Sequence, residues 1–243
     1  MTAVATPRIR KHGFSFNGAE ALSFSIMFIE QLSKDPRFFF AMLITIVVSI
    51  CLHELAHGFA AIWLGDRTPI ESGHMTLSPF VHMGIASLIC LLLAGIAWGA
   101  MPVDPRRQRG KYAQAIVAAA GPAMNVMLGL MSLTSLGLWM RFGNGADIEL
   151  SQPLENLHDL LWIFGWANLL LALFNLIPLP PLDGSRILAN FSRSYSGILE
   201  KLFSYSPIAV VQISVLVFAV AGKVISPIAE HLAVRILWWV AGF

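Results

Sequence analysis

Long apolar runs constrain this chain more than any other feature. Phe38 to Leu64 is almost continuously hydrophobic, and similar runs cover Ala113 to Met140, Leu157 to Ile177 and Ile208 to Val220. A helix rises about 1.5 Å per residue, so about 20 such residues cross the hydrocarbon core of a bilayer. The 243-residue chain is 56% hydrophobic and 12% charged, whereas soluble domains carry about 25% charged residues. We therefore expect an all-α, polytopic membrane protein.

Three weaker segments complete the expected topology. Val224 to Val240 is apolar but contains ionisable side chains, Ala19 to Leu32 is short, and Ile85 to Met101 lies at the lower limit for spanning. We expect about five to six transmembrane helices, together with one segment that is re-entrant or lies in the membrane interface. Because the connecting pieces are short, residues 1–243 are predicted to form one membrane-embedded domain without a separate soluble domain. Its core motifs fall within residues 38–190.

Charge is distributed unevenly among the connecting segments. The loop VDPRRQRGK and the segment GSRILANFSRSYSGILEK after Asp183 are basic, whereas the loop RFGNGADIELSQPLENLHD between them is net acidic. The positive-inside rule places the basic segments in the cytoplasm and the acidic loop outside. The net charge is only +2, and no basic patch alternates with aromatic residues. A nucleic-acid partner is therefore not expected.

The sequence HELAH places three ionisable side chains inside the first long apolar run. His53 and His57 are four residues apart, so on a helix both imidazoles project from one face and can bind one metal ion. Zinc accepts imidazole ligands and keeps a position for water, and Glu54 is placed to take the proton of that water as general base. Short patterns of this kind also have purely structural readings in soluble proteins. At membrane depth, however, ionisable residues are generally functional.

Two histidines leave one protein ligand to be found. The best candidate is Asp183 in NLIPLPPLDG, at the end of the run Leu157 to Ile177. The prolines interrupt regular helix, and irregular backbone at membrane depth is tolerated where it lines a protein cavity. An aspartate that caps the following helix is an equally good reading of this residue alone. His74 and His82 are interpreted as loop or interfacial histidines rather than as metal ligands.

Together these motifs resemble those of the site-2 protease family of intramembrane zinc metalloproteases. The matching stretches are HELAH, AAAGPAMN and NLIPLPPLDG, in that order. The resemblance implies one Zn²⁺ per chain, with Glu54 as the general base. The zinc ligands that it implies are His53, His57 and Asp183.

Two further positions match the family, and one stretch departs from it. Asn125 in AAAGPAMN and Asn175 in NLIPLPPLDG stand at family motif positions, for which the resemblance implies a role near the substrate or the oxyanion. Many relatives carry a stretch resembling R-x-T-L-N-P…H-x-D after the first motif. This chain reads GHMTLSPFVHMG, with Ser78 in place of the Asn and Gly84 in place of the Asp. The departure weakens any role for this stretch but leaves the metal ligands intact.

The metal ligands also constrain the topology. Asp183 lies at the cytoplasmic end of its segment, so the HELAH end of Phe38 to Leu64 must approach the same side. Ile85 to Met101 then cannot span fully, because the loops on both sides of it are cytoplasmic, and Ala19 to Leu32 should cross from a cytoplasmic N-terminus. Thr68 to Pro79 is expected to form a small β-hairpin beside the site. The resemblance favours this, since an edge strand there could hold an unfolded substrate by strand addition.

The leading functional hypothesis is an intramembrane zinc endopeptidase of the bacterial inner membrane, with its active site towards the cytoplasm. Its substrates would be single-pass membrane proteins that release a cytosolic regulator, and a regulatory membrane partner or a homo-oligomer is compatible with this. A metal-binding transporter is the second hypothesis, since intramembrane His and Asp also mark ion pathways. A transporter does not need Glu54 beside its ligands. The third hypothesis, an inactive protease-like scaffold, is disfavoured by the complete set of motif residues.

Overall fold

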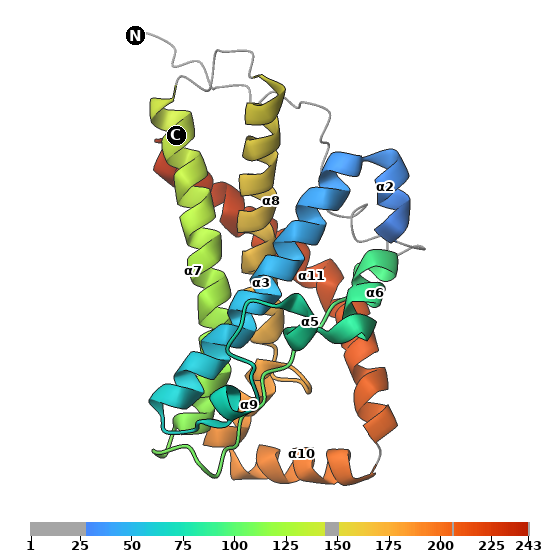
Figure 1. The fold of residues 1–243 in the computed structure, drawn as a ribbon, viewed down its shortest axis with the longest axis vertical. Coiled ribbons are helices and arrows are strands. Elements are labelled where there is room, and N and C mark those ends of the chain that lie inside the picture. Colours follow the sequence, from blue (N-terminus) through green and yellow to red (C-terminus); the bar gives the residue numbers. More distant parts are fainter. Residues whose placement is uncertain (1–27, 144–150, 206, 243) are drawn as a thin grey trace.

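The fold is a bundle of long helices closed at one end by short helices and loops (Figure 1). The computed structural model describes residues 28–143, 151–205 and 207–242, with only the backbone described at 200, 202–205 and 207–222. The elements are, in order, the 3-10 helix η1 (Phe28–Glu30), α2 (Gln31–Lys34), α3 (Pro36–Trp63), α4 (Thr68–Glu71), α5 (Pro79–His82), α6 (Gly84–Ala94), α7 (Ala113–Phe142), α8 (Gln152–Asn175), α9 (Asp183–Phe191), α10 (Arg193–Tyr205) and α11 (Pro207–Ala241).

Four helices among the described residues are long and apolar enough to cross a membrane. They are α3, α7, α8 and the part of α11 from Lys223 to Ala241. The expected class, an all-α multi-pass membrane protein, is therefore confirmed. The expected number of five to six spans is not: the described residues supply four, and most of Ala19 to Leu32 lies outside them. Ile208 to Val220 and Val224 to Val240, which we expected as separate segments, belong to the single helix α11.

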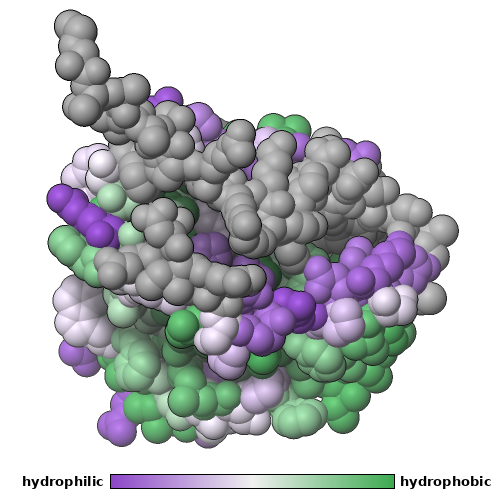
Figure 2. All heavy atoms as spheres, turned by 90° about the horizontal axis from the view of Figure 1, so that it is seen from above, coloured by the Kyte–Doolittle hydropathy of each residue, from purple (hydrophilic) through white to green (hydrophobic). Residues whose placement is uncertain are grey.

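The helix α3 begins at Pro36, just before the apolar run that starts at Phe38. Asp35 is the N-cap and accepts a hydrogen bond from the backbone N–H of Phe38, and Pro36 fills the first helical position, where no donor is needed. The outer face of α3 is hydrophobic, and Phe40 and Ile44 are about half exposed. Hydrophobic residues also gather along one side of the surface in Figure 2. Such a surface suits contact with lipid rather than water.

The helices α7 and α8 form an antiparallel pair with a close approach at two glycines. A Cβ on Gly129 would lie 3.1 Å from the carbonyl oxygen of Gly165, and one on Gly165 would lie 2.6 Å from Leu133 Cγ. Small residues let transmembrane helices approach closely, which increases dispersion contacts and brings polar side chains within bonding range. The buried core continues from this pair onto Ala229 and Ala233 of α11.

The segment Ile85 to Met101 does not form a spanning helix. α6 has 11 residues and ends at Ala94, followed by Gly95 in the left-handed conformation. At about 1.5 Å per residue, such a helix crosses only about half of the hydrocarbon core. This agrees with the expectation that the segment cannot span. Whether it enters the membrane or lies in the interface stays a prediction.

The expected β-hairpin at Thr68 to Pro79 is wrong. In the described part of the chain this segment forms the short helix α4 and then turns, and no strand is present there. Pro69 lies in the first turn of α4, and Gly73 has a φ of +72°. A proline lacks the N–H that a strand must donate, and a left-handed glycine reverses the chain. These two residues control the backbone directly and disfavour the expected strands.

A buried aspartate fastens the loops that follow α3. Asp66 is fully buried and accepts hydrogen bonds from the backbone N–H of Thr68 at 3.0 Å and of Asp104 at 2.6 Å. Burial alone would raise the pKa of Asp66, but hydrogen bonds from Thr68 and Asp104 hold the pKa below its usual range. The carboxylate therefore ties the end of α3 to the loop that leads into α7.

Replacing Asp66 by Asn should loosen this connection, because one of the two N–H groups would face an amide NH₂. We expect the free energy of unfolding in detergent to fall by roughly 1–3 kcal/mol, as for a buried donor left unpaired. The folded-state pKa is lowered, so the contribution of Asp66 is present above about pH 4 and is lost as the pH falls through the folded-state pKa.

The control is Glu71→Gln, which removes an exposed ion pair with Arg107. Such a pair contributes only about 0–1 kcal/mol. Equal losses for Asp66→Asn and Glu71→Gln at pH 7 would contradict a special role for Asp66.

Candidate metal centre

The three predicted ligands meet at one point inside the bundle. α3 carries His53 and His57 one turn apart, and Asp183 is the first residue of α9. The two Nε2 atoms lie 3.0 Å apart, and Asp183 Oδ2 lies 3.1 Å from His53 Nε2 and 3.3 Å from His57 Nε2. All three residues are buried. Among the described residues, they are the group that could hold a metal ion.

The hydrogen bonds of the two Nδ1 atoms determine whether the Nε2 atoms of His53 and His57 can bind a metal ion. His57 Nδ1 donates to the backbone carbonyl of Val117 at 2.6 Å, and His53 Nδ1 donates to Asn125 Oδ1 at 2.5 Å. A neutral imidazole with its proton on Nδ1 has a lone pair on Nε2. Two such lone pairs and the Asp183 carboxylate therefore converge. Three acceptors this close repel one another unless a cation lies between them.

The spacing and the free volume fit a tetrahedral zinc ion. Ligand atoms about 2.0–2.1 Å from zinc stand about 3.3 Å from one another, and imidazole nitrogen and carboxylate oxygen are both accepted ligands. The neighbouring helix α7 also leaves room. A Cβ on Gly121 would collide with Nε2 of both His53 and His57. The lack of a side chain at Gly121 therefore keeps open the volume that the ion needs.

The turn after α8 positions Asp183. The first turn of α9 lies directly against the end of α8, where a Cβ on Gly184 would collide with the carbonyl oxygens of Leu176 and Ile177. Leu182 holds the N-cap position of α9, and no side chain caps the helix. The reading of Asp183 as a helix cap is therefore not supported. Its side chain faces the histidines.

The electrostatics of Asp183 agree with a ligand role. Burial alone would raise the pKa of this carboxyl. A proton on an imidazole Nε2 that faces Asp183, donated by His53 or His57, outweighs burial and holds the pKa well below its usual range, and a bound cation would take the place of that proton. The carboxyl is therefore ionised at neutral pH. An ionised carboxylate is the form that binds a metal ion.

Glu54 lies beside these ligands without belonging to the group. It is 7% exposed, and irregular backbone at residues 95–104 passes over it. A Cβ on Gly99 would lie 2.5 Å from Glu54 Oε1, and the next residue, Ala100, donates its N–H to the carbonyl of His82. The carboxylate is thus enclosed between α3 and this segment.

The two predicted asparagines occupy different environments. Asn125 on α7 is fully buried and contacts His53, as described above. Asn175 ends α8, and its amide donates to the carbonyl of Leu171 in the same helix. Their implied roles near the substrate or the oxyanion stay predictions.

The two histidines that we set aside as ligands make other contacts. His74 Nδ1 lies 3.0 Å from the carbonyl oxygen of Ser72, and His82 Nε2 lies 2.6 Å from that of Thr76. Neither belongs to the group of described residues that could hold a metal ion.

Asn168 is a polar residue of the site region that the sequence analysis missed. It is fully buried in α8, and its side chain accepts a hydrogen bond from Asn125 Nδ2 at 2.8 Å. The available signal was an amide inside the apolar run WANLLLALF, where a polar group is expensive unless it is paired.

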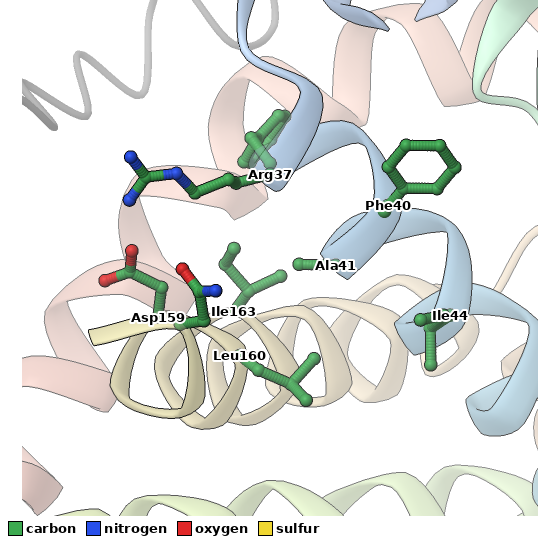
Figure 3. A pocket seen from close by; sticks show the side chains of 9 residues that line it. Arg37, Phe40, Ala41, Ile44, Asp159, Leu160 and Ile163 are labelled. Atoms are coloured by element: carbon green, nitrogen blue, oxygen red, sulfur yellow. The ribbon is translucent and has the colours of Figure 1, made fainter. Parts of the chain in front are cut away.

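A separate cleft of about 220 Å³ lies between the first turns of α3 and residues 156–163 of α8 (Figure 3). Arg37 and Asp159 are among its lining residues, whereas most of the lining, including Phe40 and Leu160, is apolar. Ile44, the residue of the cleft on α3 that lies nearest to the metal centre in sequence, is about 14 Å from His53 along the helix. The cleft is therefore distinct from the metal centre.

Gly121→Ala tests whether the volume beside the ligands serves a metal ion. The added methyl group would displace both imidazoles, so we expect the purified variant to lose stoichiometric metal. The measurement is elemental analysis of protein purified in detergent.

Gly129→Ala is the matched control, because it also adds a methyl group to a tight contact of α7 but lies against Leu169 and Gly165. This control should retain the metal even where its thermal stability falls. Retention of one metal ion per chain by Gly121→Ala would contradict the proposed position of the ion.

Comparison with known proteins agrees with this geometry. The family model "Peptidase family M50" matches residues 41–221. "Putative zinc metalloprotease YwhC" of Bacillus subtilis is 37% identical over 150 residues, which cover 60% of this chain and 67% of that protein. "Zinc metalloprotease MJ0392" of Methanocaldococcus jannaschii is 28% identical over 175 residues, or 72% of this chain and 39% of that protein.

A third relative is "Putative zinc metalloprotease Rip2" of Mycolicibacterium smegmatis, which is 31% identical over 150 residues. That match covers 57% of this chain and about half (52%) of the relative. No solved structure matches the chain. The names of these relatives and the group formed by His53, His57 and Asp183 confirm zinc as the expected cofactor. Since the family model covers most of the sequence, the chain belongs to peptidase family M50, the site-2 protease family.

Proposed function

We propose that this protein is an intramembrane zinc endopeptidase, which cuts membrane proteins within or next to a transmembrane segment. The observation that carries the proposal is the position of His53, His57 and Glu54 on α3, a helix long and apolar enough to span. Metal ligands and a general base within a membrane-spanning helix suit a substrate that is itself in the membrane. A helix that only anchored a soluble enzyme domain would not need these residues.

Each residue of the site has a defined task in this proposal. His53, His57 and Asp183 would hold the zinc ion, which when bound supplies Lewis acidity towards water and a peptide carbonyl. Glu54 takes the proton of the attacking water and passes it to the leaving amine. Gly121 keeps the space around the ligands open.

Water supply favours a site near one membrane surface. The ligands lie near the end of α3, which continues into the hydrophilic loop around Asp66, and the basic segment 103–111 is fastened to the same loop. The positive-inside rule assigns this end of the bundle to the cytoplasm. We therefore propose cleavage near the cytoplasmic leaflet, in a bacterial inner membrane.

The substrate class follows from the same geometry. A helix in lipid keeps its amides hydrogen-bonded, so the scissile segment must unwind before hydrolysis. Single-pass proteins that hold a cytosolic regulator at the membrane are the substrates that this site would release, and a regulatory membrane partner or a second copy of the chain would supply further selectivity. A transporter remains the second candidate class, but it leaves Glu54 without a task.

Glu54→Gln separates metal binding from catalysis. The amide keeps the shape of the side chain but cannot take a proton, so we expect the variant to retain one zinc ion per chain and to lose at least about 100-fold in cleavage rate. Tagged single-pass membrane proteins co-expressed with the full chain provide the assay. Asp183→Ala is the control and should lose both zinc and cleavage. Loss of zinc from Glu54→Gln would assign Glu54 a supporting role at the ligands instead.

The orientation of the bundle is tested by cysteine labelling. In a background lacking Cys51 and Cys90, a cysteine at the exposed position Ser72 should resist an impermeant thiol reagent applied to intact cells. A cysteine at Ser151, exposed at the start of α8 and at the other end of the bundle, should react. Ready labelling at Ser72 would reverse the proposed orientation and with it the water route.

A further inference from the structure

A chain of two buried amides connects the metal ligand His53 to the backbone of α8. His53 Nδ1 lies 2.5 Å from Asn125 Oδ1, Asn125 Nδ2 lies 2.8 Å from Asn168 Oδ1, and Asn168 Nδ2 lies 2.8 Å from the carbonyl oxygen of Phe164. Both asparagines are fully buried. These hydrogen bonds therefore connect α3 through α7 to α8 by way of two fully buried side chains.

The carbonyl group of Phe164, the last group in this series of hydrogen bonds, determines the direction of all the others. The carbonyl of Phe164 can only accept, so Asn168 must turn its NH₂ towards that carbonyl and its oxygen towards Asn125. Asn125 must then offer its NH₂ to Asn168 and its oxygen to His53. An amide that could be placed either way round is thus oriented by its neighbours.

The orientation of Asn125 determines which nitrogen of His53 carries the proton. With an oxygen opposite Nδ1, His53 carries its proton there and keeps the Nε2 lone pair for the ion. A reversed Asn125 amide would instead place a donor against Nδ1. The proton would then favour Nε2, where it would block coordination.

We propose that Asn168 is a positioning residue for zinc binding. It acts through Asn125 and selects the tautomer of His53 that can bind the metal ion. The inference rests on the proposed zinc site but not on the proposed proteolysis. His57 needs no such relay, because its Nδ1 faces the carbonyl of Val117 directly.

The first test compares two side chains that both connect α7 to α8. Asn168→Ala removes the acceptor that orients Asn125, and we expect it to weaken zinc binding roughly tenfold or more, as for outer-shell partners of metal ligands. Ser132→Ala removes the hydrogen bond from Ser132 to the carbonyl of Leu161 on the same helix pair. This control should bind zinc within about twofold of the unmodified chain, because it has no link to His53.

Asn168→Leu separates orientation from packing. Leucine fills the space but offers no acceptor, so it should weaken zinc binding as alanine does. The readout is competition against a chromophoric zinc chelator, with full-length protein in detergent. Normal zinc affinity in Asn168→Leu would mean that a cavity explains the alanine result, and the proposal would fall.

Asn125→Asp provides the decisive background. A carboxylate presents an oxygen to His53 Nδ1 whichever way round it lies, so its orientation no longer needs to be selected, but its other oxygen faces the Asn168 oxygen and the two repel. Adding Asn168→Ala to Asn125→Asp should therefore leave zinc affinity unchanged or raise it. A loss as large as in the native background would show that Asn168 only supports packing, which overturns the proposal.

The outcomes also separate this inference from the proposed function. An unmodified chain that binds no zinc would contradict both. An unmodified chain that binds zinc but cleaves no membrane protein would contradict only the proteolysis. If both activities are present and Asn168→Ala behaves like Ser132→Ala, only the relay is wrong.

Discussion

Three hydrogen-bond acceptors held within 3.3 Å of one another form the constraint on which the rest of this structure depends. Left alone they repel, and at membrane depth there is little water to separate them. The surrounding helices bring these acceptors together and leave space between them. α3 supplies the rings, α7 supplies the free volume at Gly121, and α9 starts where its first side chain faces inward. A bound zinc ion would replace this repulsion by attraction and would cross-link α3 to the start of α9.

The local part of this arrangement was readable from the sequence, and the non-local part only in outline. The spacing of His53 and His57 determines that both rings share a face of any helix. Asp183 lies 130 positions from His53, so its role depends on how the turn after α8 packs. Read alone, the residue was as compatible with a helix cap as with a ligand. The apolar runs predicted both ends of α3 and α7 to within about two residues, but α8 begins at Gln152, ahead of the run that starts at Leu157.

The failures have physical causes of the same kind. The expectation of a hairpin at Thr68 to Pro79 gave too little weight to Pro69 and Gly73. These two residues control the backbone directly. The pairing of Asn125 with Asn168 depends on the register between α7 and α8. In that register Gly129 lies close to Gly165, and a single sequence does not reveal it.

The length of α11 has a consequence for the whole bundle. Its 35 residues extend about 50 Å, whereas the hydrocarbon core is about 30 Å thick. The excess must be taken up by tilt, by bending near Pro227 or by projection beyond the bilayer, and Figure 1 shows α11 crossing behind α7 and α8 at a steep angle. Hydrophobic mismatch thus acts on a helix whose Ala229 and Ala233 pack into the core formed with these two helices. A change in the tilt of α11 would therefore be felt by the two helices that carry Asn125 and Asn168.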